Sequence, residues 1–143
     1  MSLLRNPDFE SGQLQPWKLV VGADTAEHHV INEVDKARTG SHCLKFKAST
    51  ERSSVAQDIA VTMPSVTALA YVRADTIDVS GSLTIWDLAA NRKISAPFKV
   101  GQTWTQVVAM LGRQNSGTNG PVRIELYMDT TGASMYIDSV AAF

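Results

Sequence analysis

Apolar side chains alternate with small or polar ones along much of this chain, and this period of two restricts the possible folds more than any other feature. In residues 82–87, for example, Leu83 and Ile85 share one side of the pattern, while Thr84 and Trp86 share the other. Successive side chains of a β-strand point to opposite faces, so such segments are typical of strands with one buried face. The same alternation occurs in residues 54–61, 67–74 and 122–128.

Turn-forming Gly, Pro, Asn and Ser residues separate these segments at intervals of roughly 10–15 residues. Weaker strand patterns cover residues 17–21, 26–31, 93–98 and 105–111. About ten short strands without a long helix predict an all-β fold, a two-sheet antiparallel β-sandwich of the jelly-roll type. We expect residues 1–143 to form a single domain, because a chain of this length can bury one core.

Composition and charge argue against several classes of partner. The formal net charge is −1, and no cluster of Lys and Arg suggests binding to nucleic acid or to a membrane surface. No run of about 18 apolar residues is present, so no membrane-spanning helix is expected. The first residues do not show the charged and then apolar pattern of a signal peptide. Cys43 is the single cysteine and is expected to be a buried, unreactive thiol.

Two acidic residues near the two ends of the chain suggest a cation site. Glu10 follows an Asn-Pro-Asp-Phe turn, and Asp138 belongs to a closing strand pattern. The first and last strands of a sandwich often lie side by side, and two adjacent carboxylates need a shared proton or a cation. Ca²⁺ is the usual cation because it accepts hard oxygen ligands. The alternative is that Glu10 makes only a turn hydrogen bond and Asp138 is only a surface charge.

Six motifs, in order, resemble those of carbohydrate-binding modules of families 4, 9 and 22. They comprise Asn6-Pro7-Asp8-Phe9-Glu10-Ser11-Gly12 with Trp17, Thr39-Gly40-Ser41-His42-Cys43-Leu44, Ser54-Val55-Ala56-Gln57-Asp58-Ile59, Ala70-Tyr71-Val72-Arg73-Ala74, Gly101-Gln102-Thr103-Trp104-Thr105 and Tyr136-Ile137-Asp138-Ser139-Val140. The resemblance covers about residues 4–143. It departs from the family pattern in residues 60–67, where a loop that usually contains Gly and Tyr is shorter and lacks both.

The resemblance implies a galactose-binding-like β-sandwich that is not an enzyme and that attaches a larger secreted protein to polysaccharide. By position, it implies structural calcium held by Glu10 and Asp138, with backbone or side-chain oxygens of Asp8, Thr39 and His42. The domain is then extracellular and monomeric, and it can be a fragment of a multidomain glycoside hydrolase. The shortened loop makes it unsafe to transfer a preference for xylan or β-glucan.

The alternation itself indicates a candidate ligand-binding face. If the strands concerned belong to one sheet, their outward aromatic and charged side chains form one patch, which suits a sugar because rings pack on its C–H faces and polar groups bind its hydroxyls. The candidates are Tyr71, Arg73, Trp86, Arg123, Glu125 and Tyr127. Gln57 joins them only if its strand twists or bulges, because it is in phase with Val55 and Ile59.

Each candidate also has a purely structural interpretation. Trp17 and Trp104 follow turns and are expected to fill the ends of the core. Trp86 can instead cover the sheet or contact another subunit, and Arg73 with Glu125 can form a cross-strand ion pair. If sugar binding has been lost, the domain is a structural or adhesion module that uses this face for protein–protein contact.

No catalytic arrangement is favoured by the sequence. A nucleophile elbow, a phosphate-binding Gly-rich loop and a dinucleotide fingerprint are all missing. His28 and His29 are adjacent on an expected strand, so their rings point to opposite faces. A glycosidase could still use Asp87 and Glu125 as its carboxylate pair, although nothing nearby would raise the pKa of one of them.

Overall fold

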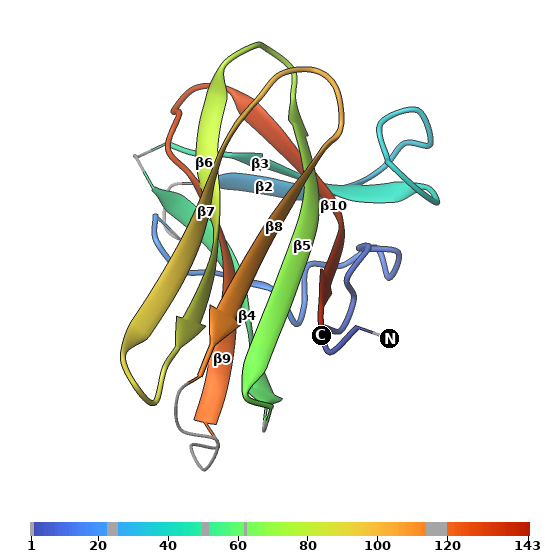
Figure 1. Ribbon diagram of the computed structural model, residues 1–143. Helices are drawn as coiled ribbons and strands as arrows, with labels where there is room; N and C mark the ends of the chain where they lie inside the picture. The colour runs from blue at the N-terminus through green and yellow to red at the C-terminus, as the bar shows by residue number, and fades with distance from the viewer. Residues whose placement is uncertain (1, 23–25, 50–51, 62, 114–119) are drawn as a thin grey trace.

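A computed structural model describes residues 2–22, 26–49, 52–61, 63–113 and 120–143, and within them it contains ten β-strands and no helix (Figure 1). The strands are β1 Lys18–Leu19, β2 Glu27–Asn32, β3 His42–Lys47, β4 Ser53–Val61, β5 Ser65–Ala74, β6 Val79–Asp87, β7 Arg92–Val100, β8 Thr105–Gly112, β9 Gly120–Met128 and β10 Ser134–Ala142. In the described residues, no helix has the length and apolar character needed to cross a membrane.

The strands form two five-stranded antiparallel sheets. Sheet A has the order β1-β4-β9-β6-β7, and sheet B has the order β2-β3-β10-β5-β8. The predicted two-sheet antiparallel sandwich is therefore confirmed. Consecutive strands often belong to different sheets, as β3 and β4 do, and β5 and β6 do.

The core lies between the sheets and receives alternate residues of the long strands, as predicted. Leu83 and Ile85 of β6 and the four apolar residues of β9, Val122, Ile124, Leu126 and Met128, are completely buried. Trp17 fills one end of the core, where its indole Nε1 donates a hydrogen bond to the Asn6 carbonyl at 3.0 Å and its ring packs 5.8 Å from that of Phe9. The expectation for Trp17 is confirmed, and the buried Cys43 also agrees with prediction.

The expectation that Trp104 fills the other end of the core is wrong. Trp104 lies just before β8, is only partly buried, and has its ring 5.2 Å from the Arg73 guanidinium. Val107, Ala109 and Leu111 of β8 already supply the core residues at this end of sheet B. Trp104 therefore packs against a cation at the sheet surface.

The loop between β2 and β3, residues 33–41, folds over part of the outer face of sheet B. Its Arg38 guanidinium lies 3.4 Å from the centre of the Tyr71 ring, and its Lys36 carbonyl accepts a hydrogen bond from Arg73 at 3.1 Å. We call this segment the β2–β3 loop. The rest of the outer face of sheet B, over β2, β3 and the start of β10, lies beyond these contacts.

The first and last segments of the chain lie side by side, and Figure 1 shows the two ends close together. The Leu3 amide donates to the Ala142 carbonyl at 2.7 Å, and the Val140 amide donates to the Pro7 carbonyl at 2.9 Å. The prediction that the ends of the chain adjoin is consistent with these hydrogen bonds, which bring Glu10 near the C-terminal strand.

Candidate functional site

Trp86 lies near the C-terminal end of β6, on the outer face of sheet A, the face turned away from the core. In register with it are Arg123 on β9, Asp58 on β4 and Lys93 on β7. We call these four residues the Trp86 face. The Trp86 side chain is partly exposed, in contrast to its neighbours Leu83 and Ile85, and the Lys93 ammonium lies 4.8 Å from its ring. This partly exposed indole provides a flat apolar surface among charged groups.

A buried hydrogen-bonded chain fixes the orientation of Trp86. Its indole Nε1 donates to the Tyr127 hydroxyl at 3.3 Å, and that hydroxyl donates to Glu125 Oε1 at 2.8 Å. The other carboxylate oxygen of Glu125 accepts a short hydrogen bond from the Ser54 hydroxyl. Burial, followed by the hydrogen bond to Glu125, raises the pKa of Tyr127. Glu125 is only 1% exposed, so it holds the Tyr127 hydroxyl in place and offers no free oxygen to a large ligand.

Beside Trp86, Arg123 and Asp58 form a bidentate ion pair. Arg123 Nε donates to Asp58 Oδ1 at 2.7 Å, and a terminal guanidinium nitrogen donates to Asp58 Oδ2 at 3.2 Å. Lys18 Nζ lies 3.4 Å from the same Asp58 oxygen. The hydrogen bond from Arg123 lowers the pKa of Asp58, and the hydrogen bond to Asp58 raises the pKa of Arg123. Both groups stay charged over the physiological pH range and retain partly exposed atoms for hydrogen bonding.

The sequence prediction missed Asp58, Lys18 and Lys93. Asp58 alternates with Ile59 and is in phase with Ala56, so the pattern of residues 54–61 already placed it on the outer face. Lys93 faces Trp86 only through the pairing of β6 with β7, and Lys18 reaches Asp58 only through the short strand β1. These two could not be found from the sequence without knowing the strand order.

Tyr71 and Arg73 do not belong to the Trp86 face, so the single predicted patch is wrong. Both lie on β5 of sheet B, whereas Trp86, Arg123, Glu125 and Tyr127 lie on β6 and β9 of sheet A. The β2–β3 loop covers them: Arg38 lies over Tyr71, and Arg73 binds the Lys36 carbonyl. The suggested cross-strand pair of Arg73 with Glu125 is excluded for the same reason.

Gln57 also lies outside the Trp86 face. Its strand, β4, keeps a regular alternation, without the twist or bulge that would turn Gln57 outward. The side chain is 3% exposed and points away from the Trp86 face, as Val55 and Ile59 do. Its Oε1 accepts from the Arg5 amide at 2.8 Å and its Nε2 donates to the Arg5 carbonyl at 2.9 Å. Gln57 therefore holds the N-terminal segment against the sandwich.

Asp87 and Glu125 cannot act together as a glycosidase pair. Asp87 is in phase with the core residues Leu83 and Ile85, whereas Glu125 lies on the opposite face of sheet A. Asp87 is 1% exposed and is held by the buried Arg113, whose Nε lies 3.4 Å from its Oδ2. The two carboxylates have no common space in which a glycosidic bond could lie.

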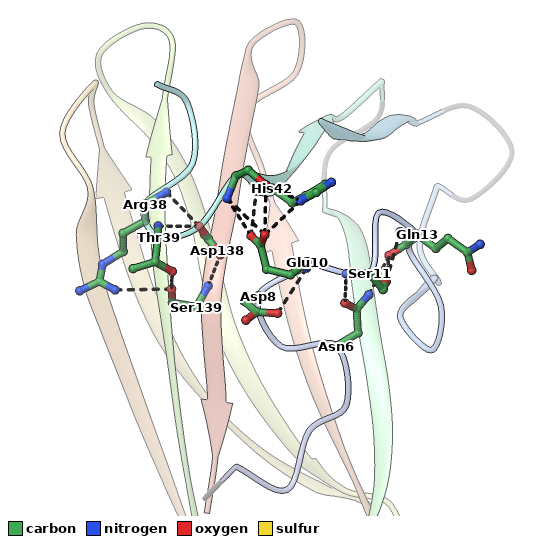
Figure 2. Close-up of polar contacts among 11 residues, drawn as sticks. Asn6, Asp8, Glu10, Ser11, Gln13, Arg38, Thr39, His42, Asp138 and Ser139 are labelled. Atoms are coloured by element: carbon green, nitrogen blue, oxygen red, sulfur yellow. Dashed lines mark hydrogen bonds and ion pairs between the residues drawn. The ribbon is translucent and has the colours of Figure 1, made fainter. Parts of the chain in front are cut away.

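Glu10 and Asp138, which lie near opposite ends of the sequence, both accept hydrogen bonds from the segment of residues 38–42 (Figure 2). Asp138 Oδ2 accepts from the Arg38 and Thr39 amides at 2.9 and 3.2 Å, and Oδ1 accepts from the Ser139 amide at 2.7 Å. Burial raises the pKa of Asp138 despite these hydrogen bonds, and the charge of Glu10 adds to the rise.

The Glu10 carboxylate accepts hydrogen bonds from the next residues of that segment. The Ser41 and His42 amides donate to Glu10 Oε2 at 3.2 and 2.9 Å, and His42 Nδ1 lies 3.1 Å from Oε1. Burial alone would raise the pKa of Glu10, but the hydrogen bonds from His42 and Ser41 outweigh it and lower the pKa to about 2. Gly40 has a φ of +64°, and an added Cβ would lie 2.6 Å from Glu10 Oε2, so the carboxylate occupies the space that a side chain would need.

These contacts bear on the predicted calcium site. Two carboxylates supply the oxygen ligands that Ca²⁺ prefers, and Asp8 is adjacent, with its Oδ1 accepting from the Glu10 amide at 3.3 Å. The amides of Thr39 and His42, however, donate to the carboxylates, so a cation would have to replace some hydrogen bonds. No group of three or more His, Cys, Asp or Glu side chains is placed to hold a metal in the described ranges. Calcium binding stays a prediction.

Comparison with solved structures identifies the architecture. TmCBM61, in complex with β-1,4-galactotriose, matches with a TM-score of 0.77 and 17% identity over 100% of this chain and 98% of its own. The CBM22-1 xylan-binding domain of Paenibacillus barcinonensis Xyn10C matches with a TM-score of 0.71 and 17% identity over 94% of this chain and 89% of its own. The fold is that of carbohydrate-binding modules. At the level of the fold, this confirms the resemblance seen in the sequence.

The same fold also occurs in a larger protein of another kind. The enzymatically active domain of tailspike protein 4 from bacteriophage CBA120 matches with a TM-score of 0.76 and 15% identity, over 99% of this chain and 21% of its own. No family model matches the sequence, and no curated protein matches it.

Proposed function

We propose that this domain is a non-catalytic module that binds polysaccharide through the Trp86 face. The observation that carries the proposal is a partly exposed indole on the outer face of a sheet, held by a hydrogen bond to the buried Tyr127 and flanked by a charged pair. The fold supports it, since matching structures include a complex with galactotriose and, in the Clostridium thermocellum Xyn10B modules, one with xylohexaose.

The residues of the Trp86 face divide the recognition between them. The Trp86 ring packs on the C–H face of a sugar, while Arg123 donates to hydroxyls and Asp58 accepts from them. Tyr127 and Glu125 keep the indole plane in place, so they are positioning residues. An open face that orders few ligand atoms is expected to give modest affinity for a single chain. Attachment to a larger secreted protein then increases binding through a high effective concentration.

The test is affinity electrophoresis through gels that contain xylan, mixed-linkage β-glucan, β-galactan, mannan or pectin. We expect retardation of the wild-type domain in at least one neutral gel and its loss in Trp86→Ala. Trp104→Ala is the matched control, because Trp104 is also a partly buried tryptophan but lies just before β8, against Arg73 of sheet B. Equal retardation of both variants, or none of the wild type in any neutral gel, would contradict the proposal.

The alternative is a structural module in which this face, or the exposed Val108 and Met110 of β8, contacts protein. The match to part of a phage tailspike favours keeping this alternative. A sugar-binding module is expected to remain monomeric as its concentration rises, whereas a protein interface is expected to give a concentration-dependent dimer. Sedimentation equilibrium of the wild type and Trp86→Ala distinguishes the two.

We further propose that Ca²⁺ binds at the junction of the chain ends, with Glu10 and Asp138 as acidic ligands and oxygens of Asp8, Thr39 and His42 completing the site. The proximity of two carboxylates, one of which raises the pKa of the other, supports this proposal. We expect Ca²⁺ to raise the Tm of the wild type after EDTA treatment, because it binds only the folded state. The rise should disappear in Glu10→Gln, and an unchanged wild-type Tm would refute calcium binding.

A further inference from the structure

A groove crosses the outer face of sheet B where β2, β3 and the start of β10 lie side by side. It consists of two adjoining hollows, of about 280 and 170 Å³, that share Glu27 and Lys47 as walls. The larger hollow extends toward Thr131 and Gly132, and the smaller one extends toward His29, Lys45 and Ser134. We call this the β2–β3 groove. Each hollow is smaller than the roughly 300–1,000 Å³ of an enclosed small-molecule site, so the groove suits one or two sugar rings.

Strand register places the charged side chains of the groove on one face. Glu27 is opposite Lys47, and His29 is opposite Lys45. Leu44 and Phe46, which alternate with the two lysines along β3, point into the core. Lys45 and Lys47 are two residues apart on one strand, so their side chains project from the same face and their Cα atoms are about 7 Å apart. The face therefore presents two cations in a row with one carboxylate beside them.

The charges of the groove are not neutralised by neighbours within the described part of the chain. Among the described residues, Glu27, His29 and Lys47 make no side-chain hydrogen bond or ion pair, although Glu27 and Lys47 are directly opposite in register. Lys45 Nζ lies 6.0 Å from the centre of the Tyr136 ring, which is a distant contact. The Arg73 guanidinium lies 4.1 Å from the centre of the same ring and adds positive charge behind the groove.

We propose that the β2–β3 groove is a second ligand site, which binds a sugar unit bearing a carboxylate, such as a uronate. Lys45 and Lys47 bind the carboxylate and adjacent oxygens, and Glu27 accepts hydrogen bonds from ring hydroxyls. A charge-assisted contact is stronger than a neutral one, and two lysines in a row match the anionic groups along an acidic glycan. Glu27 disfavours a ligand that is only an anion, because it repels negative charge that brings no hydroxyl donors.

The groove adds a site to the proposed function and does not depend on the Trp86 face. The two lie on opposite sheets of the sandwich, so a chain bound on one face leaves the other free. Loss of binding at one can therefore be measured separately from loss at the other.

The test is calorimetric titration of the wild-type domain with oligogalacturonate and with the same oligosaccharide as its methyl ester, which removes the charge and keeps the sugar. We expect binding of the acid that weakens with added salt, and at least tenfold weaker binding of the ester. Lys47→Gln should weaken binding of the acid about fivefold or more, because it removes a charge-assisted contact. Lys99→Gln is the matched control, with the same charge change at an exposed residue of β7 on sheet A, and should leave affinity within about twofold.

Two further variants separate the groove from nonspecific anion binding and from the Trp86 face. Glu27→Gln should make polyglutamate, an anion without hydroxyls, bind better than it binds the wild type, and Trp86→Ala should leave oligogalacturonate binding unchanged. The inference is overturned if acid and ester bind equally, if neither binds, or if Lys47→Gln and Lys99→Gln behave alike. Loss of oligogalacturonate binding in Trp86→Ala would also overturn it, by assigning the acidic glycan to the Trp86 face. Thermal unfolding of each variant confirms that it is folded.

Discussion

The two outer faces of the sandwich satisfy their polar groups in different ways. On sheet A, Glu125, Tyr127 and Trp86 form one hydrogen-bonded chain, and Arg123 pairs with Asp58. On sheet B, the β2–β3 loop covers one part, and Glu27 and Lys47 of the β2–β3 groove have no partners within the described residues. The difference shows that outward direction on a strand does not by itself make a side chain available to a ligand.

A polar group that is already satisfied supports its neighbours, whereas an unpartnered charge is ready to bind another molecule. Glu125 and Glu27 illustrate the two cases, because both are outward-facing glutamates on strands. Glu125 is 1% exposed and accepts two hydroxyl donors, while Glu27 is exposed and accepts none from the described residues. Substitutions on the two faces can test whether they differ in this way.

The largest difference is expected between Glu125→Gln and Glu27→Gln. The first variant leaves only one acceptor oxygen for two buried hydroxyl donors and should lower the free energy of unfolding by about 1–3 kcal/mol. The second changes an exposed side chain outside any described ion pair and should alter it by less than about 0.5 kcal/mol. Urea denaturation measures both values. Equal losses would mean that the two faces do not differ in how their carboxylates are used.

The stability of the segment that covers part of sheet B should depend on pH through Glu10, because the Glu10 carboxylate accepts hydrogen bonds from the Ser41 and His42 amides. Its pKa is lowered from an ordinary 4.5 to about 2 in the folded protein, so the ionised form favours folding. This contribution is complete above about pH 4.5 and is lost as the pH falls toward 2. Asp138 has the opposite sign, because its raised pKa makes protonation favour the folded state.

Thermal unfolding between pH 2 and 6 measures the contribution of Glu10 as the difference between the wild type and Glu10→Gln. That difference should be greatest at the upper end of the range and should shrink as the pH falls. Glu33→Gln, which changes an exposed glutamate of the β2–β3 loop, is the control and should follow the wild type. A difference that does not vary with pH would show that the hydrogen bonds from Ser41 and His42 do not select the ionised form.

The smallest difference between the two sheets is expected for the arginines stacked on tyrosine. Arg38 lies 3.4 Å from the centre of the Tyr71 ring on sheet B, and Arg52 lies 5.0 Å from that of Tyr127 on sheet A. Arg38→Gln should cost about 0.5–1 kcal/mol of unfolding free energy, and Arg52→Gln should cost less, because the attraction falls with distance. Chemical denaturation of both variants measures the costs. A larger loss of unfolding free energy for Arg52→Gln would contradict the expectation that Arg38 stabilises Tyr71 more than Arg52 stabilises Tyr127.

Strand positions and inward faces were largely predictable because they depend on local sequence. The alternation in residues 54–61 and 122–128 corresponds to β4, Ser53–Val61, and β9, Gly120–Met128, with the expected core residues. The pattern in residues 17–21 was less informative, since β1 is limited to Lys18–Leu19.

Membership of the two sheets was not predictable, because it depends on pairing between distant segments. β5 and β6 are consecutive, yet β5 pairs with β10 and β8, and β6 pairs with β7 and β9. For this reason the sequence pattern alone places Tyr71 and Arg73 in the same predicted patch as Trp86, although they lie on the other sheet. Coverage by the β2–β3 loop also depends on tertiary structure, and no local pattern indicated that Arg38 would lie over Tyr71.

The adjoining ends of the chain allow the connectivity of the domain to be altered without changing its sheets. The Ala142 amide donates to the Ser2 hydroxyl at 3.1 Å, so a short peptide of a few residues can join the two termini into a closed ring. A closed backbone has fewer unfolded conformations and should be more resistant to heat than the linear chain. New termini can then be opened at a surface turn such as the one between β6 and β7, which gives a circular permutant with the same two sheets. Such a permutant would carry a fused protein at the turn after β6 instead of beside the last strand.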